Sequence, residues 1–303
     1  MGYSLGSTSL VEKILAIALL ATLVACGGET ETGDDLSDAS DASDIADASI
    51  MYRVQELVLR DPHIAVEAPF IGCIDLTDEG APMGLAPSVN SMIQTSITTD
   101  DDADGDLDLS LLMFVNPLET SPGGSGLIRI GDGRCSSPLA TTVCSVDSAD
   151  PLQDSSYSNS EAGATSDCLG LLDGTTSDYS PPVSSVAPDC YVSDEVDLVL
   201  DIGGIMVELE SARVSAQYSA DGEGVSMVGG LIRGFMSEQR ASEITLPDDL
   251  PVVGGQPVDS ILPGSASGCS TIDARDTGPD GSTLGWWFYL NFEASAVDTD
   301  ATW

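Results

Sequence analysis

Apolar and polar residues alternate through much of the second half of this 303-residue chain. In residues 196–202 and 205–209, every second position is apolar, and acidic residues fill several of the positions between. A period of two residues is typical of β-strands that bury one face. Asp221 and Gly222 form a turn signal, after which the apolar run at residues 225–231 returns. These segments predict an antiparallel meander with one solvent-facing side.

Two segments in the first half also have strand character. Residues 53–66 alternate loosely and predict the first strand. Residues 107–115 place Leu109 and Leu111 on one face and Leu112 on the other. Because both faces of this second segment are apolar, it is expected to form a central strand.

The strongest strand signal is aromatic and lies in residues 286–297. A two-residue period places Trp286 and Phe288 on one face and Trp287 and Tyr289 on the other. Exposed rings would suit stacking on a sugar, whereas buried rings would pack in a core or, on the second face, beneath a helix. Packing is the favoured interpretation, because large aromatic side chains are mostly buried.

Helical spacing is confined to short segments. Val89, Ile93 and Ile97 recur three to four residues apart and predict a short amphipathic helix. Residues 237–244 predict a second helix, and residues 258–262 a helical turn. The chain is therefore expected to be mainly β, an antiparallel sheet or sandwich with two or three short helices.

The N-terminus reads as an export signal. Residues 14–25 carry no charge and follow Glu12 and Lys13, and this run is shorter than the ~20 residues of a membrane-spanning helix. Leu23, Ala25 and Cys26 stand where a bacterial lipobox has its conserved positions. We expect residues 1–25 to be a lipoprotein signal peptide and Cys26 to be lipidated, so that acyl chains hold the protein to a membrane.

Residues 26–50 are acidic and nearly free of large apolar groups, with Asp at every third position from Asp38 to Asp47. Such a segment buries too little apolar area to offset its ordering entropy. It is expected to be a disordered tether, although a solvated helix remains the alternative. Residues 51–303 would then form a single β-rich domain.

Residues 117–194 differ from the rest of that domain. They are rich in Ser, Gly, Pro and Asp and contain four cysteines. We expect a loop-rich insertion with about two short strands, stapled by disulfides, because long structureless loops are uncommon in compact domains.

The charge balance excludes several classes of partner. The chain has 50 Asp and Glu, 9 Lys and Arg, and a formal net charge of −41. A nucleic-acid partner is excluded because phosphate binding needs a basic surface. A polybasic contact with anionic lipid is excluded for the same reason. Such an acidic surface suits a cation or simply a solvated exterior.

Six cysteines remain after Cys26, an even number in an exported chain: Cys73, Cys135, Cys144, Cys168, Cys190 and Cys269. An oxidising compartment favours three disulfides over free thiols, and six cysteines allow 15 pairings. We expect short-range closure of Cys135 with Cys144 and of Cys168 with Cys190, which leaves Cys73 for Cys269. A zinc site is the alternative, but the chain has no C-x-x-C pair and its only histidine, His63, is remote.

An acidic loop carries the clearest candidate chemistry, and its carboxylates alternate along the chain at Asp100, Asp102, Asp104, Asp106 and Asp108. Ca²⁺ takes six to eight oxygen ligands, and alternating carboxylates in a tight loop can converge on one ion. Gly105 stands where such loops turn, and the pattern resembles the first nine positions of an EF-hand loop. The resemblance ends at Leu111, where that family has a bidentate Glu. Calcium is therefore the expected cofactor, with an unoccupied acidic turn as the alternative.

Most known catalytic signatures are absent from the sequence. His63 has no evident Ser or Cys companion, and residues 26–303 contain no Lys, which excludes Schiff-base chemistry and a phosphate-binding P-loop there. Carboxylate pairs suited to glycoside cleavage are not excluded, because Asp and Glu are abundant.

Several segments carry a resemblance to uncharacterised Asp-rich lipoproteins of Gram-negative bacteria. They are the lipobox, the acidic tether, and residues 106–111 (DLDLSL), 229–235 (GGLIRGF), 278–281 (GPDG) and 286–288 (WWF). The resemblance implies an envelope location but no activity. Gly27 follows the lipidated cysteine where an Asp would signal retention, which implies the outer membrane, on its periplasmic or outer face.

These observations lead to one expected function and two alternatives. We expect a lipid-anchored, non-catalytic binding or adhesion domain with a protein or glycan ligand, stabilised by calcium. The alternatives are a hydrolase that acts on polysaccharide through paired carboxylates, and a structural or assembly factor of the envelope. Fold by itself carries little weight among them.

Overall fold

The structure is a computed structural model that describes residues 49–68, 72–80, 82, 87–146, 152–202, 205–221, 224–248, 250, 253–269 and 275–299. The expected signal peptide, Cys26 and nearly all of the expected tether lie outside these residues. Within them, no helix is both long enough and apolar enough to cross a membrane.

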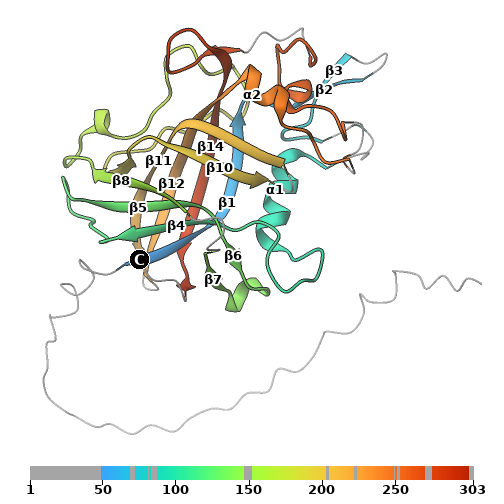
Figure 1. Cartoon of the computed structure of the whole chain (residues 1–303). Helices are drawn as coiled ribbons and strands as arrows, with labels where there is room; N and C mark the ends of the chain where they lie inside the picture. Colours follow the sequence, from blue (N-terminus) through green and yellow to red (C-terminus); the bar gives the residue numbers. More distant parts are fainter. Residues whose placement is uncertain are drawn as a thin grey trace, which may run out of the picture. The chain divides into compact units, whose positions relative to one another are not determined.

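The central feature is an antiparallel sheet that closes on itself (Figure 1). Its strands, in spatial order, are β1 (Ile50–Asp61), β4 (Leu111–Asn116), β5 (Ser125–Asp132), β8 (Gln153–Asn159), β9 (Cys190–Ser193), β11 (Ile205–Asp221), β12 (Gly224–Ser237) and β14 (Leu284–Ala296). The ring closes because β1 pairs with β4 on one side and with β14 on the other. Closure pairs most of the strand edges that an open sheet would expose.

Smaller elements extend this sheet or lie outside it. Two strands are added to it: β10 (Val196–Ile202) pairs with β11, and β13 (Asp276–Thr277) pairs with the start of β14. The separate strands are the hairpin of β2 (Ala65–Ala68) and β3 (Gly72–Asp75), and a group of β6 (Arg134–Cys135), β7 (Val143–Ser145) and β15 (Asp298–Thr299). The helices are α1 (Val89–Thr98) and α2 (Glu238–Glu243), with 3-10 turns η2 (Leu139–Thr141), η3 (Thr165–Asp167) and η4 (Val258–Ile261). The predicted mainly β fold with short helices is confirmed.

The alternation of β14 divides its aromatic side chains between two cores. Trp286 and Phe288 belong to the main cluster, together with Tyr52 of β1. Trp287 and Tyr289 pack on the opposite face, in a second cluster that includes residues of the 168–186 segment. Burial of each large side chain contributes on the order of 1.5–3 kcal/mol. The predicted packing role of these rings is confirmed, with a coil rather than a helix covering the second set.

Two strand boundaries differ from the prediction. The first strand ends at Asp61, and β2 begins only at Ala65, because Pro62 lacks the N–H that a ladder needs. The fourth strand begins at Leu111 rather than at residue 107. Leu107 is buried, but its N–H donates to the carbonyl of Cys135, and that of Leu109 to Ser96 in α1. Alternating burial therefore continues beyond the end of the strand ladder.

Residues 117–194 contain more strand than expected. They supply β5, β8 and β9 to the closed sheet, in addition to β6 and β7. Their polar composition fits exposed faces: in β8 only Tyr157 is buried. The segment is therefore part of the main sheet as well as a source of long loops.

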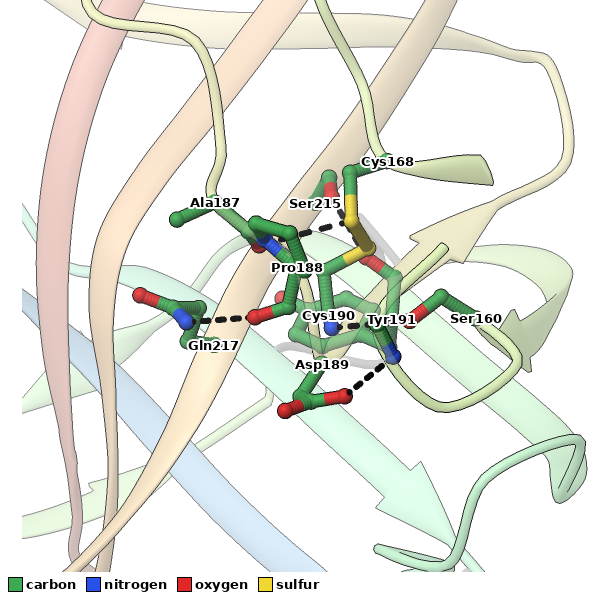
Figure 2. The surroundings of a disulfide bond; sticks show 10 residues. Ser160, Cys168, Ala187, Pro188, Asp189, Cys190, Tyr191, Ser215 and Gln217 are labelled. Atoms are coloured by element: carbon green, nitrogen blue, oxygen red, sulfur yellow. Dashed lines mark hydrogen bonds between the residues drawn. A yellow bond between two sulfur atoms is a disulfide. The ribbon is translucent and has the colours of Figure 1, made fainter. Parts of the chain in front are cut away.

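All three cysteine pairs match the expected pairing, with Cα–Cα distances of 4.1 Å for Cys135–Cys144, 5.8 Å for Cys168–Cys190 and 5.7 Å for Cys73–Cys269. Figure 2 shows the second of these, which ties a loop to the first residue of β9. Beside it, Gln217 of β11 donates its side-chain amide to the carbonyl of Pro188 at 2.7 Å.

Candidate functional site: an apolar cavity beside an acidic loop

An apolar cavity of about 440 Å³ is formed between α1, η4 and four strands of the closed sheet. Leu59 of β1 and Leu290 of β14 line it from the sheet, and so do Ile205 of β11 and Met236 of β12. This volume lies within the range of about 300–1,000 Å³ that is usual for small-molecule sites.

The cavity forms where β1 loses its partner strand. β4 pairs with β1 only across Ile50–Arg53, whereas β14 follows β1 as far as Asp61. Beyond Arg53, α1 lies along the free edge (Figure 1). The side chain of Asn90 accepts from the N–H of Leu59 at 2.8 Å and donates to its carbonyl at 3.0 Å. A helix side chain thus takes the place of a neighbouring strand, which leaves room for a cavity beside it.

The sequence of α1 explains how it presents an apolar face to the cavity. Ser88 caps its N-terminus by accepting from the N–H of Ser91 at 3.2 Å. Ile93 and Ile97, one helical turn apart, are buried. Val89 and Ile93 both line the cavity, so the predicted amphipathic face forms part of the cavity wall.

The remaining wall comes from two segments far apart in the sequence. Val66 and Leu76 line the cavity from the region of the β2–β3 hairpin, and Val258 and Ile261 line it from η4. The Cys73–Cys269 disulfide joins these two regions. The bridge therefore links two parts of the wall covalently.

The few polar groups of the cavity lie on one side. Ser91, Thr95 and Ser96 line it from α1, and Asp101 follows that helix. Among the lining residues in the described part of the chain, Asp101 is the only charged one. Arginine is absent from the lining, although all eight arginines of residues 26–303 are described.

The acidic loop adjoins this polar side. Carboxylate oxygens of Asp100, Asp102 and Asp108 lie within 4.8 Å of one another. Asp104 and Asp106 are outside that group, and the Asp104 carboxylate instead accepts from the N–H of Asp106 at 2.8 Å. Three of the five predicted ligands are thus brought together.

Backbone hydrogen bonds shape the loop. The Asp100 carboxylate accepts from the N–H groups of Asp104 and Gly105, each at 3.1 Å. The Asp108 carboxylate accepts from the N–H of Asp101 at 3.1 Å. Gly105 has φ of +99°, a conformation that glycine adopts without strain. Leu111 is buried in β4, so no ligand comes from the twelfth position.

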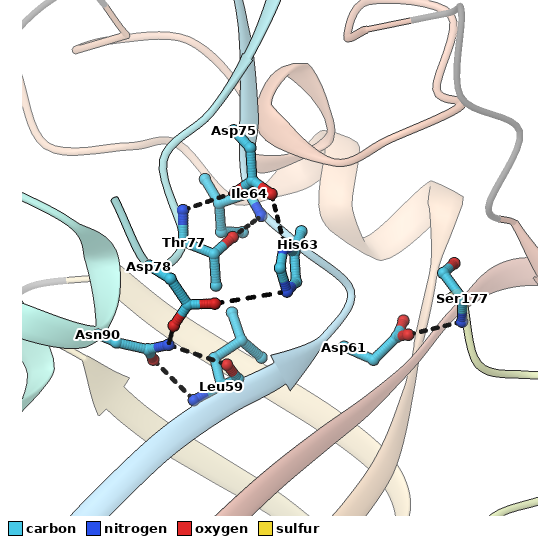
Figure 3. Close-up of polar contacts among 9 residues, drawn as sticks. All are labelled: Leu59, Asp61, His63, Ile64, Asp75, Thr77, Asp78, Asn90 and Ser177. Atoms are coloured by element: carbon cyan, nitrogen blue, oxygen red, sulfur yellow. Dashed lines mark hydrogen bonds and ion pairs between the residues drawn. The ribbon is translucent and has the colours of Figure 1, made fainter. Parts of the chain in front are cut away.

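His63 lies in a polar cluster that the sequence did not reveal (Figure 3). Its Nδ1 is 2.5 Å from Oδ2 of Asp75, and its ring stacks on Tyr179 at 3.6 Å between centroids. Oδ2 of Asp78 lies 3.8 Å from its Nε2. Burial raises the pKa of Asp75, but hydrogen bonds from His63 and Thr77 outweigh this and hold it below its ordinary value. No Ser or Cys is hydrogen-bonded to the ring among the described residues.

Two carboxylates outside the cavity lining have raised pKa values, that of the buried Asp61 and that of the half-buried Asp276. Asp61 ends β1 and accepts from the N–H of Ser177 at 2.8 Å, and burial raises its pKa to about 7 (Figure 3). Asp276 accepts from the N–H of Trp287 at 3.0 Å, and burial raises its pKa to about 6. Both carboxylates therefore bind protons more readily than exposed ones do.

Comparison with protein-family models, curated proteins and solved structures found no match to this chain. The assignment of a function therefore rests on the geometry of the described residues.

Proposed function

We propose that this chain is a lipid-anchored envelope protein that binds an apolar small molecule in the cavity and does not act as an enzyme. The anchor would be the acylated Cys26, and residues 27–50 would hold the domain away from the membrane. The observation that carries the proposal is a cavity of about 440 Å³ with an almost wholly apolar lining. Cavities of this size and chemistry are typical of ligand sites.

Two further observations favour binding over catalysis. A glycoside hydrolase needs two carboxylates on either side of its substrate. Among the described lining residues the cavity has one carboxylate, Asp101, and no histidine. His63, the single histidine, is engaged by Asp75 instead.

Blocking the cavity tests this proposal. Ile205 and Met206 are neighbours on β11, but Ile205 lines the cavity while Met206 is 40% exposed and does not. Binding is measured by the displacement of a neutral dye, Nile red, by dodecanol, because both would compete for the apolar cavity. We expect Ile205→Trp to abolish this displacement. Met206→Trp, the matched control, should leave binding unchanged.

The same assay gives a quantitative signature. For the unsubstituted cavity, affinity should rise about fourfold with each methylene of a straight-chain alcohol until the cavity is full, because each buried CH₂ contributes ~0.8 kcal/mol. Equal binding by the two Trp variants, or no dependence on chain length, would contradict the proposal. The full chain with Cys26→Ser is suitable, since no detergent is then needed to solubilise an acyl group.

We also propose that Ca²⁺ binds the acidic loop and stabilises the domain. The support is the convergence of Asp100, Asp102 and Asp108. Three carboxylates this close repel one another, and a divalent cation bound by their oxygens would offset that repulsion. Calcium would then brace the loop that follows α1.

Thermal unfolding tests the calcium clause. At Ca²⁺ one hundred times above its dissociation constant, stability should rise by about 2.7 kcal/mol relative to protein in chelator. Asp102→Asn should reduce this gain, whereas Asp106→Asn, outside the group of three, should retain it. A melting temperature that is unchanged by Ca²⁺ in the parent chain would remove calcium from the proposal.

A further inference from the structure

The polar side of the cavity has one charged residue among its described lining residues, and that residue is acidic. Asp101 is exposed, lines the cavity, and forms no ion pair with any described residue. The acidic group of Asp100, Asp102 and Asp108 lies directly beside it in the chain. A ligand that fills the apolar part would therefore bring its polar end close to an unneutralised carboxylate.

The C-terminal end of α1 lies on the same side but is already paired with a cation. Helix dipoles place partial negative charge at this end, and the buried guanidinium of Arg53 donates to the carbonyl of Ile97 there. Thr95 and Ser96 line the cavity near that end, and their hydroxyl oxygens can accept hydrogen bonds. The negative field at the polar side of the cavity therefore comes from Asp101 and the neighbouring acidic group.

From this charge complementarity we infer that the natural ligand is a cationic amphiphile, a hydrocarbon chain that ends in an amine. The inference rests on the proposed function and specifies its ligand class. The chain would occupy the space between Leu59, Ile205 and Leu290, and the ammonium group would lie at Asp101. A carboxylate head group would meet repulsion from Asp101 and would find no arginine in the lining to pair with.

Three ligands with the same chain and different heads test the inference: dodecylamine, dodecanol and dodecanoate. The affinity of each ligand is measured by displacement of Nile red from the full chain with Cys26→Ser, below the ligand's micelle concentration. Chelator is present so that bound Ca²⁺ does not neutralise the acidic loop. We expect dodecylamine to bind at least about tenfold more tightly than dodecanoate, with dodecanol between them. The difference should narrow as salt shortens the screening length from about 30 Å at low ionic strength to about 8 Å.

Matched variants locate the effect. Asp101→Asn should reduce the preference for dodecylamine over dodecanoate about threefold. Asp104→Asn removes the same charge from the same loop, but Asp104 does not line the cavity. This variant should reduce the preference for dodecylamine less than Asp101→Asn does. Dodecanoate binding as tightly as dodecylamine while dodecanol still binds would overturn the inference and leave the proposed function intact. No binding by any of the three would overturn both.

Discussion

Removal of the Cys73–Cys269 disulfide is expected to lower the free energy of unfolding by about 5 kcal/mol. This bridge spans 196 residues, the longest separation of the three. Loop-closure entropy grows with the number of residues enclosed, so this bridge restricts the unfolded chain most. The measurement is urea unfolding of the oxidised protein with and without paired Cys→Ala substitutions.

The Cys135–Cys144 bridge is the matched control, because its sequence separation is only 9. Its removal should cost about 2.5 kcal/mol, and removal of Cys168–Cys190, with a separation of 22, about 3.5 kcal/mol. The order of the three losses is the test. A loss at Cys135–Cys144 as large as that at Cys73–Cys269 would mean that local packing, rather than chain entropy, decides the stability.

Dodecanol binding provides a second readout of the same substitutions. The Cys73–Cys269 bridge joins the hairpin region that includes Leu76 to the region that includes Val258, and both residues line the cavity. Without the bridge these two parts of the wall are held only by non-covalent contacts. We expect weaker dodecanol binding in that variant and unchanged binding when Cys135 and Cys144 are replaced.

The strands could be predicted from the sequence, but their closure into a ring could not. Alternation in residues 286–297 predicts two faces with different side chains, and in the structure the two faces of β14 pack in different clusters. Alternation does not identify the partner strand, however. β1 pairs with β14 although more than two hundred residues separate them, and a two-residue period is the same for any partner.

The cavity had no signal in the sequence, because its walls come from separate segments. Leu59, Ile205 and Leu290 each fit an ordinary core position in their own strand. The contact of Asn90 with the edge of β1 at Leu59 also joins distant segments, and a single Asn in a helix does not reveal such a contact. The acidic loop, in contrast, is continuous in the chain, so its residues could be named in advance.

The histidine cluster was missed for a similar reason. Asp75 is 12 residues from His63, across the hairpin of β2 and β3, and Tyr179 lies in a remote loop. No local spacing relates these three residues. The pairing of cysteines was easier, since an even number and two short separations reduced the choices.

Stability is expected to fall as the pH rises from about 4 to about 7, and Asp61 is the main local cause. Burial raises the folded-state pKa of Asp61 from its ordinary value of 3.8 to about 7. Between these values the folded protein keeps a proton that the unfolded chain has released, so each rise in pH favours unfolding. The stability that the protonated Asp61 carboxyl contributes is fully present below pH 4 and is lost above pH 7. At 1.36 kcal/mol per pKa unit the loss amounts to about 4 kcal/mol.

Asp61→Asn should remove this dependence. The Asn oxygen can still accept from the N–H of Ser177, as the carboxylate does at 2.8 Å. We therefore expect the variant to match the parent at pH 4 and to exceed it in free energy of unfolding at pH 8. Asp173→Asn is the control, because Asp173 is exposed and its replacement changes the net charge by the same amount.

Asp276 acts in the same direction, with a pKa raised to about 6, so some dependence should persist in the Asp61 variant. Asp75 and Asp280 act in the opposite direction and at lower pH, because hydrogen bonds hold their pKa values below the ordinary range. Their stabilisation is present above pH 4 and is lost as the pH falls further. The two effects occupy different pH windows, so urea unfolding from pH 2 to pH 8 separates them. If the free energy of unfolding of the Asp61 and Asp173 variants depended on pH in the same way between pH 4 and pH 7, burial of Asp61 would not be the cause of the loss of stability.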